Sequence, residues 1–433
     1  MDSRFNVINW VHRATRGWSY GASIIDPRTG EIIKGHVTLG SLRVRQDILI
    51  AEALLNDADS AEAQAMALAR IRQLSAHEVG HTIGIAHNFA ASESDRASVM
   101  DYPHPLITLD ADGNIALNDA YDEGIGLWDK LVVAYGYGDS PEQAISDIQN
   151  SGINYVSDRH ARPVDGAFAD GHLWDNHNDP TSEYRRLGDI RRKALSQLNQ
   201  SALANGDIAA RLDDLLVPLY NLPRYQADGV AKQIGGFNIQ SSLVGEAQQL
   251  TPVPAQRQQQ ATLALIESIS DEALAIQPEL IQLLVPHPTG FNRTRESSPS
   301  QLAELADNTA MAEAYIRHVL QRLVAPNRLN RLVGASYSLE QHLDLVINML
   351  EFDQARTSIA QRRDVISLRA LFDSLDSSSL SEEAKTILWA KLVDLNEQTN
   401  VTSAHGKRMS SLLDGVSPPS ASDAQMLPPG SPI

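Results

Sequence analysis

The 433-residue sequence contains no cysteine. Disulfide bonds, thiolate metal sites and cysteine nucleophiles are therefore excluded, and a metal ion has only histidine, aspartate and glutamate side chains to bind it. Aromatic residues make up only 5% of the chain, so the core has to be mainly aliphatic, which favours helices. Apolar residues at 42% and charged residues at 21% match an ordinary globular protein, and the length suits two or three domains.

Basic residues are in deficit, with 36 Lys and Arg against 54 Asp and Glu and a net charge of −18. Because an acidic surface repels phosphate groups, nucleic acid and anionic membranes are poor partners. No apolar run approaches the roughly 18 residues of a membrane span, so no span is expected. The first residues, MDSRFNVINWVHR, also lack the apolar centre of a secretion signal.

The first 40 residues have the pattern of strands and turns. The turn residues Asp26–Gly30 separate the segments Trp18–Ile25 and Glu31–Leu39, which predicts a β-hairpin. A helical pattern begins near Arg45. Asp59 and Glu62 have the spacing of a capping box, and they predict a helix that runs to about residue 83.

The second half of the chain has a different character. Residues 91–118 and 150–180 are rich in Pro, Gly, Ser and Asp and predict loops, with a helix over 120–135 between them. Beyond residue 182 nearly every segment has helical periodicity. The expected units are a first module at 1–150, an irregular connection at 151–185, a helical domain at 186–415 and a disordered Pro/Ser-rich tail at 416–433.

Residues 77–87 read HEVGHTIGIAH and carry the clearest chemistry in the chain. His77 and His81 lie one helical turn apart on the same face, so both imidazoles reach one cation. Glu78 points to the side, as suits a base for a metal-activated water. A left-handed turn at Gly84 returns the chain so that His87 becomes the third ligand. Three neutral nitrogens with an open fourth position are typical of catalytic zinc.

Two other interpretations of this segment stay open. The histidines are ordinary surface or core groups of a helix, or the zinc has only a structural role. The added Gly and third His at this spacing make a chance match very improbable, on the order of 10⁻⁴.

The pattern HExxHxxGxxH resembles that of the metzincin metallopeptidases, and Ser98-Val99-Met100-Asp101-Tyr102 resembles their Met-turn. The resemblance implies that Met100 is the apolar floor under the metal, although ordinary core packing would account for it as well. It also implies that Tyr102, two residues later, is the donor that stabilises the transition state.

The similarity extends over about residues 1–400 to a bacterial family of large, zinc-dependent, metzincin-type proteases. Its members are usually longer and exported, so the resemblance implies a fragment of a longer protein and an extracellular or periplasmic location. The implied fold class is α+β: a zincin module with a small mixed sheet, an active-site helix and a Met-turn, followed by a mainly α-helical C-terminal domain. The matching phrases are GSLRVRQD, RIRQLSAHEVGHTIGIAHNFAAS, SVMDYPHP, GIGLWDKLVVAYGY, HLWDN, LVPLYNLPRYQ and IGG.

Metzincins bind an extended substrate along an edge strand, and the resemblance assigns that role to Gly35, His36, Val37 and Thr38; an ordinary inner or edge strand is the alternative.

Residues 158–179 contain five Asp and predict either a calcium loop or a solvated connection. Trp128 is expected to pack the lower subdomain. Asn88 is expected to hydrogen-bond locally and to orient the turn after the third histidine.

The predicted function is that of a zinc-dependent metalloendopeptidase that cleaves polypeptides, with Glu78 as general base and later general acid. One alternative is a zinc-binding module without proteolytic activity that works through its helical domain. The other is a zinc hydrolase for a non-peptide amide, which would use the same residues. The sequence does not indicate an oligomeric state.

Overall fold

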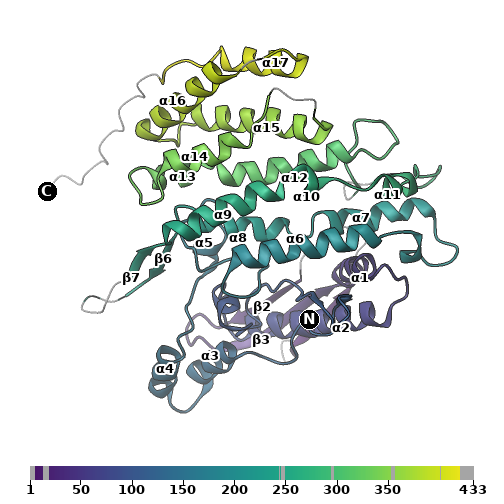
Figure 1. The fold of residues 1–433 in the computed structure, drawn as a ribbon. Helices are drawn as coiled ribbons and strands as arrows, with labels where there is room; N and C mark the ends of the chain where they lie inside the picture. The colour runs from purple at the N-terminus through teal and green to yellow at the C-terminus, as the bar shows by residue number, and fades with distance from the viewer. Residues whose placement is uncertain are drawn as a thin grey trace.

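The computed structural model describes residues 5–12, 19–242, 244, 249–293, 297–352, 356–399 and 401–419. The fold is α+β and mostly helical. Figure 1 shows a small sheet and the first helices at one end of the molecule, with the later helices stacked above them in successive layers that end in α17. The expected tail at 416–433 lies outside the described residues from residue 420 onwards.

The N-terminal sheet contains β1 (Val7–Val11), β2 (Tyr20–Ile25) and β3 (Ile32–Gly40) in the order β1-β3-β2. β1 runs parallel to β3 and β2 runs antiparallel to it. The predicted hairpin is therefore confirmed. Its turn is closed by the N–H of Asp26, which donates to the carbonyl of Glu31 at 2.9 Å.

Two long helices follow the sheet, α1 (Ser41–Leu55) and α2 (Ala61–Thr82). The predicted end of α2 is confirmed, but its cap is one residue later than expected. The side chain of Ser60 accepts a hydrogen bond from the N–H of Ala63, whereas Asp59 lies before the helix in a left-handed conformation with φ of 62°.

The helix expected over 120–135 is shorter than predicted and begins later, as α3 (Leu127–Tyr137). A Cβ atom at Gly126 would lie 1.9 Å from the carbonyl oxygen of Ala97, so the chain passes very close to another backbone there. This close approach fixes a non-helical conformation just before residue 127, and helix formation starts only after it.

The remaining elements, apart from short 3₁₀ turns, are two hairpins and a long series of helices. The hairpins are β4 (Thr108–Leu109) with β5 (Ile115–Ala116) and β6 (Phe237–Gln240) with β7 (Gln249–Pro252). The helices of the central part of the chain are α4 (Pro141–Asn150), α5 (Asp158–Ala161), α6 (Pro180–Gln197), α7 (Leu212–Tyr220), α8 (Arg224–Gln233), α9 (Ala255–Ser268), α10 (Asp271–Leu274) and α11 (Pro278–Leu283). The C-terminal helices are α12 (Asn308–Leu323), α13 (Pro326–Leu332), α14 (Leu339–Asn348), α15 (Ser358–Leu375), α16 (Glu382–Gln398) and α17 (Ala404–Leu413). In the part of the chain that is described, none of the helices has both the length and the apolar character that crossing a membrane requires.

One large apolar core joins the two halves of the molecule. It runs from Ala51 in α1 and Met66 in α2 to Leu388 in α16 and Leu413 in α17. The predicted boundaries at residues 150 and 185 stay predictions, and the buried apolar cluster is continuous across them. The helical half packs on the N-terminal part through α1, which contacts α6 and α7 as well as α2.

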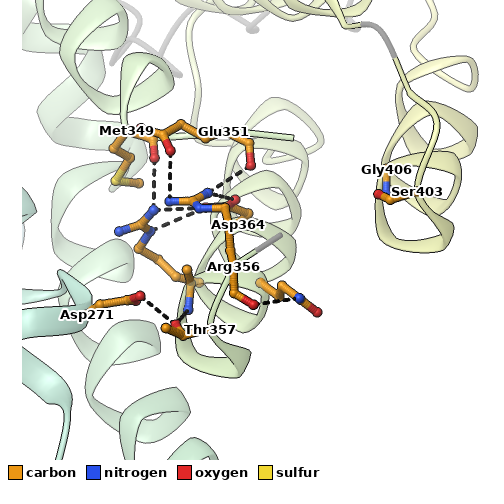
Figure 2. Close-up of polar contacts among 11 residues, drawn as sticks. Asp271, Met349, Glu351, Arg356, Thr357, Asp364, Ser403 and Gly406 are labelled. Carbon is orange, nitrogen blue, oxygen red and sulfur yellow. Dashed lines mark hydrogen bonds and ion pairs between the residues drawn. The ribbon is translucent and has the colours of Figure 1, made fainter. Parts of the chain in front are cut away.

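A buried ionic cluster joins residues after α14 to residues before and within α15. The side chain of Asp364 is fully buried, and its two oxygens pair with Arg356 at 2.6 Å and with Arg363 at 3.2 Å (Figure 2). Arg363 also donates to the carbonyl of Met349 at 3.0 Å, and Arg356 pairs with Glu351 at 3.3 Å. Burial nevertheless raises the pKa of Asp364 to about 6.

Candidate metal centre

Helix α2 and the turn after it bring the three predicted histidines together. His77 and His81 lie one turn apart in the last part of the helix. Gly84 then takes a left-handed conformation with φ of 88°, and the chain turns back so that His87 faces the helix. The spacing argument from the sequence is therefore confirmed in three dimensions.

The Nε2 atoms of the three rings converge on one point. They lie 3.1 Å apart for His81 and His87, 3.2 Å apart for His77 and His81, and 3.3 Å apart for His77 and His87. Three nitrogens bound at 2.0–2.1 Å around a tetrahedral ion lie about 3.3–3.4 Å from one another, so the arrangement has the size of a zinc site.

The opposite nitrogen of each ring faces an oxygen that accepts a hydrogen bond. Nδ1 of His77 lies 2.6 Å from the carbonyl of Val99, and Nδ1 of His81 lies 2.9 Å from the carbonyl of Ile85. Nδ1 of His87 lies 2.7 Å from a carboxylate oxygen of Asp158. Each Nδ1 therefore carries the proton, and each Nε2 presents a lone pair to the shared point.

Three lone pairs that face one another repel unless a cation lies between them. Protonation does not supply that cation at His77, because burial lowers its pKa to about 3. Burial also lowers the pKa of His87, although Asp158 opposes the effect. The residues therefore fit a divalent metal ion, and neutral imidazoles favour zinc.

Glu78 is buried beside the sheet. Burial raises the pKa of its carboxyl group to about 7, against the opposing hydrogen bond from the N–H of Gly21. Helix α2 and strand β2 approach very closely here, because a Cβ atom at Gly21 would lie 1.9 Å from the carbonyl oxygen of Glu78. The catalytic role of Glu78 stays a prediction.

Met100 is fully buried against the active-site helix, and its role as the floor of the site stays a prediction. A Cβ atom at Gly80, between the two helical histidines, would lie 2.4 Å from the sulfur of Met100. The turn is held by Asp129 of α3, whose carboxylate accepts from the hydroxyl of Ser98 at 2.6 Å and from the N–H of Val99 at 2.8 Å.

Tyr102 lies beside the histidines, where the resemblance placed it. Its ring centroid is 4.9 Å from that of His87 and 5.4 Å from that of His77. Nη2 of Arg162 donates to its hydroxyl oxygen at 3.3 Å. Its role in the transition state stays a prediction.

The assignment of the substrate-binding edge strand to Gly35, His36, Val37 and Thr38 is wrong. These residues belong to β3, which is hydrogen-bonded to β1 on one side and to β2 on the other. The backbone of a central strand is already paired, so it has no groups to offer a peptide. Of the strands that the structure describes in this sheet, β2 lies at an edge and packs on the active-site helix.

Of the two interpretations of residues 158–179, the calcium loop is not supported. Asp158 binds His87, Asp165 accepts from Asn327, and Asp179 caps α6, so their oxygens point to different partners. Within the described ranges, the three histidines are the one group of His, Asp or Glu side chains close enough together to hold a metal ion.

Two smaller predictions are confirmed. Trp128 is buried in a cluster with Ala97 and Ile153. Asn88 is fully buried, and its side-chain oxygen accepts from the N–H of Ala90 at 3.2 Å.

Sequence reasoning missed Asp158 and Asp129. Asp158 lies 71 residues beyond His87, and no local spacing connects the two. Asp129 stands in the first turn of a helix after a glycine, a position typical of a capping acid, and this signal indicates a hydrogen-bonding role.

The comparisons with known proteins agree with this geometry. A profile of the Met-zincin family matches residues 59–361, which is well over half of the chain. The match includes the active-site helix, the Met-turn and the helices through α14. No curated protein and no solved structure matches the chain. With a three-histidine site of zinc dimensions and a family profile over most of its length, the chain belongs to the Met-zincin family.

Proposed function

We propose that the protein is a zinc-dependent metalloendopeptidase. The observation that carries the proposal is the convergence of the three histidine Nε2 atoms, which lie 3.1–3.3 Å from one another. The Nδ1 atom of each ring faces an oxygen that accepts its hydrogen bond. Three neutral protein ligands leave one position open for water or substrate, which is typical of catalytic zinc. Membership of the Met-zincin family supports the same conclusion.

Bound at the three histidines, zinc supplies Lewis acidity, which polarises the scissile carbonyl group and acidifies water. Glu78 takes a proton from the attacking water and passes it to the nitrogen of the leaving amine. The hydroxyl of Tyr102 donates a hydrogen bond to the oxyanion that develops on the carbonyl oxygen. No covalent bond to the protein is required.

The edge strand β2 supports a polypeptide as the substrate. Among the described residues it pairs with β3 alone, and the N–H of Gly21 within it bonds to the carboxylate of Glu78. An extended peptide that adds to β2 by main-chain hydrogen bonds would therefore pass beside the proposed base. The proposal includes an extracellular or periplasmic location, which immunoblotting of fractionated cells tests.

The decisive experiment is hydrolysis of a mixed peptide library by the zinc-loaded protein, read by mass spectrometry. Glu78→Gln is the test variant, and Glu142→Gln in α4, where the side chain is exposed, is the matched control. We expect cleavage by the wild type and the control, and a loss of at least about 10²-fold in Glu78→Gln at unchanged zinc content.

Internal cleavage sites identify an endopeptidase. Zinc bound at one ion per chain without cleavage of any peptide would contradict the proposal and favour a binding module. Cleavage that persists in Glu78→Gln would contradict the assigned base.

A further inference from the structure

The segment at residues 154–158 lies against the turn that carries the third histidine, His87. The side chain of Asn88 accepts from the N–H of Val156 at 3.0 Å and donates to the carbonyl of Asn154 at 2.8 Å. The N–H of Phe89 donates to the carbonyl of Val156 at 2.9 Å. Helix α5 (Asp158–Ala161) starts two residues after Val156, so its first residue, Asp158, lies beside the metal centre.

Asp158 uses each of its two carboxylate oxygens for a different partner. One oxygen lies 2.7 Å from Nδ1 of His87, and the other accepts from Nε of Arg162 at 2.5 Å. The Asp158 side chain is 42% exposed and that of Arg162 is 48% exposed. Ion pairs this exposed contribute little to stability, so the pair is better explained by what it orients.

Arg162 continues the connection to Tyr102. Its Nη2 lies 3.3 Å from the Tyr102 hydroxyl oxygen, and its guanidinium carbon lies 5.5 Å from the centroid of that ring. The guanidinium group only donates, so the hydroxyl oxygen accepts, and the hydroxyl keeps its own hydrogen for another partner. The centroid of the Tyr102 ring lies 4.9 Å from that of the His87 ring. Contacts therefore link His87, Asp158, Arg162 and Tyr102 in a closed ring.

We propose that Asp158 and Arg162 are positioning residues of this site. Asp158 fixes His87 with its proton on Nδ1 and its Nε2 directed at the metal position. Arg162 occupies the hydroxyl oxygen of Tyr102 and so directs the O–H toward the reacting carbonyl. The role of Asp158 concerns metal binding alone. The role of Arg162 rests on the proposed function.

The first test measures the zinc dissociation constant of the full-length protein by competition with a chelator. The variants are Asp158→Ala and the isosteric Asp158→Asn, and the control is Arg159→Ala, an exposed residue of the same short helix. We expect Asp158→Ala to weaken zinc binding about 10- to 100-fold. Asp158→Asn, whose amide oxygen still accepts, weakens it less, and the control leaves it unchanged.

A second readout is the tautomer of His87 in the zinc-free protein, measured by ¹⁵N NMR of the imidazole. We expect the Nδ1–H form in the wild type and a mixture with the Nε2–H form in Asp158→Ala. Circular dichroism shows which variants are folded, and Asp158→Asn carries the test if the alanine variant is unfolded. An unchanged zinc dissociation constant in the folded variants would overturn the role of Asp158.

The Arg162 part is tested by the affinity of the zinc-loaded protein for a phosphinic peptide, whose tetrahedral group imitates the oxyanion and needs no turnover. We expect Arg162→Ala to weaken this binding about tenfold without changing the zinc dissociation constant. When Tyr102→Phe is already present, we expect Arg162→Ala to cause no further loss of affinity for the phosphinic peptide. An equal loss of affinity with and without Tyr102→Phe overturns the role of Arg162. If the wild type does not bind the phosphinic peptide, the proposed function and the Arg162 part both fail, while zinc affinity still decides the role of Asp158.

Discussion

The carbonyl oxygen of Val99 accepts a hydrogen bond from Nδ1 of His77 at 2.6 Å. The same carbonyl accepts from the side chain of Gln73, one turn earlier in α2, at 3.1 Å. The Met-turn is therefore attached to the active-site helix at the first metal ligand. Its position determines both the proton location on His77 and the direction in which that ring presents Nε2.

Asp129 supports this attachment from the other side, and its loss tests the connection. Its carboxylate accepts from Ser98, Val99 and the N–H of Gly126, and its side chain is buried. We expect Asp129→Asn to lower the free energy of unfolding by about 1–3 kcal/mol, because an amide replaces one acceptor by a donor. Zinc binding weakens as well. Urea unfolding and chelator competition measure the two effects, with the exposed Asp139→Asn as control; equal unfolding midpoints for all three proteins would contradict the prediction.

Gly80 and Met100 are expected to be energetically coupled. Alanine in place of glycine within a helix normally stabilises by about 0.5–1 kcal/mol. At Gly80 the new methyl group would meet the sulfur of Met100, so we expect Gly80→Ala to destabilise by about 1–3 kcal/mol instead.

With Met100→Ala already present, the steric conflict is removed and Gly80→Ala becomes neutral or stabilising. The free energies of unfolding of the wild type, the two single variants and the double variant test this directly. Additive effects would show that the two side chains do not meet.

At Gly21, strand β2 lies very close to the active-site helix. Gly21→Ala places a methyl group against the carbonyl oxygen of Glu78, so the strand has to move away from the helix. We expect a loss of about 1–3 kcal/mol in stability and a fall in peptide hydrolysis. Gly188→Ala in α6 is the matched control, because its Cβ would meet nothing within 4 Å; it is expected to stabilise by up to about 1 kcal/mol. The same sign of change in both variants would refute the argument.

Acid stability depends on Asp228, which joins α8 to α12. Burial alone would raise its pKa, but hydrogen bonds from His318 and Arg322 lower the pKa to about 2. Since the folded pKa lies below the unfolded value near 3.9, the contribution to stability is complete above about pH 4 and is lost as the pH falls toward 2. It amounts to about 2–3 kcal/mol, because one pKa unit corresponds to about 1.4 kcal/mol.

Asp228→Asn should therefore be less stable than the wild type at pH 7, and the difference should shrink between pH 4 and pH 2. Urea unfolding across this pH range measures it. A difference that stays constant down to pH 2 would assign the effect to packing and not to the charge.

Local geometry explains which parts of the fold could be predicted. The hairpin around Asp26–Gly30, the end of α2 and the helical periodicity beyond residue 182 each depend on residues within one or two turns of one another. The start of α3 could not be predicted, because Gly126 is held by the backbone of Ala97, a residue from another segment. The order of the strands in the sheet could not be predicted either, since it depends on pairing between distant segments.

The sequence by itself determined the metal ligands. His77 and His81 share a helical face because of the helix period, and His87 returns to them because Gly84 adopts the left-handed conformation between them. The tertiary structure alone decided that Asp158 holds His87, that β2 rather than β3 forms the edge, and that Asp129 supports the Met-turn. These relationships join residues 30 or more positions apart or depend on the order of strands, and only the packing of the folded chain brings such groups within hydrogen-bonding distance.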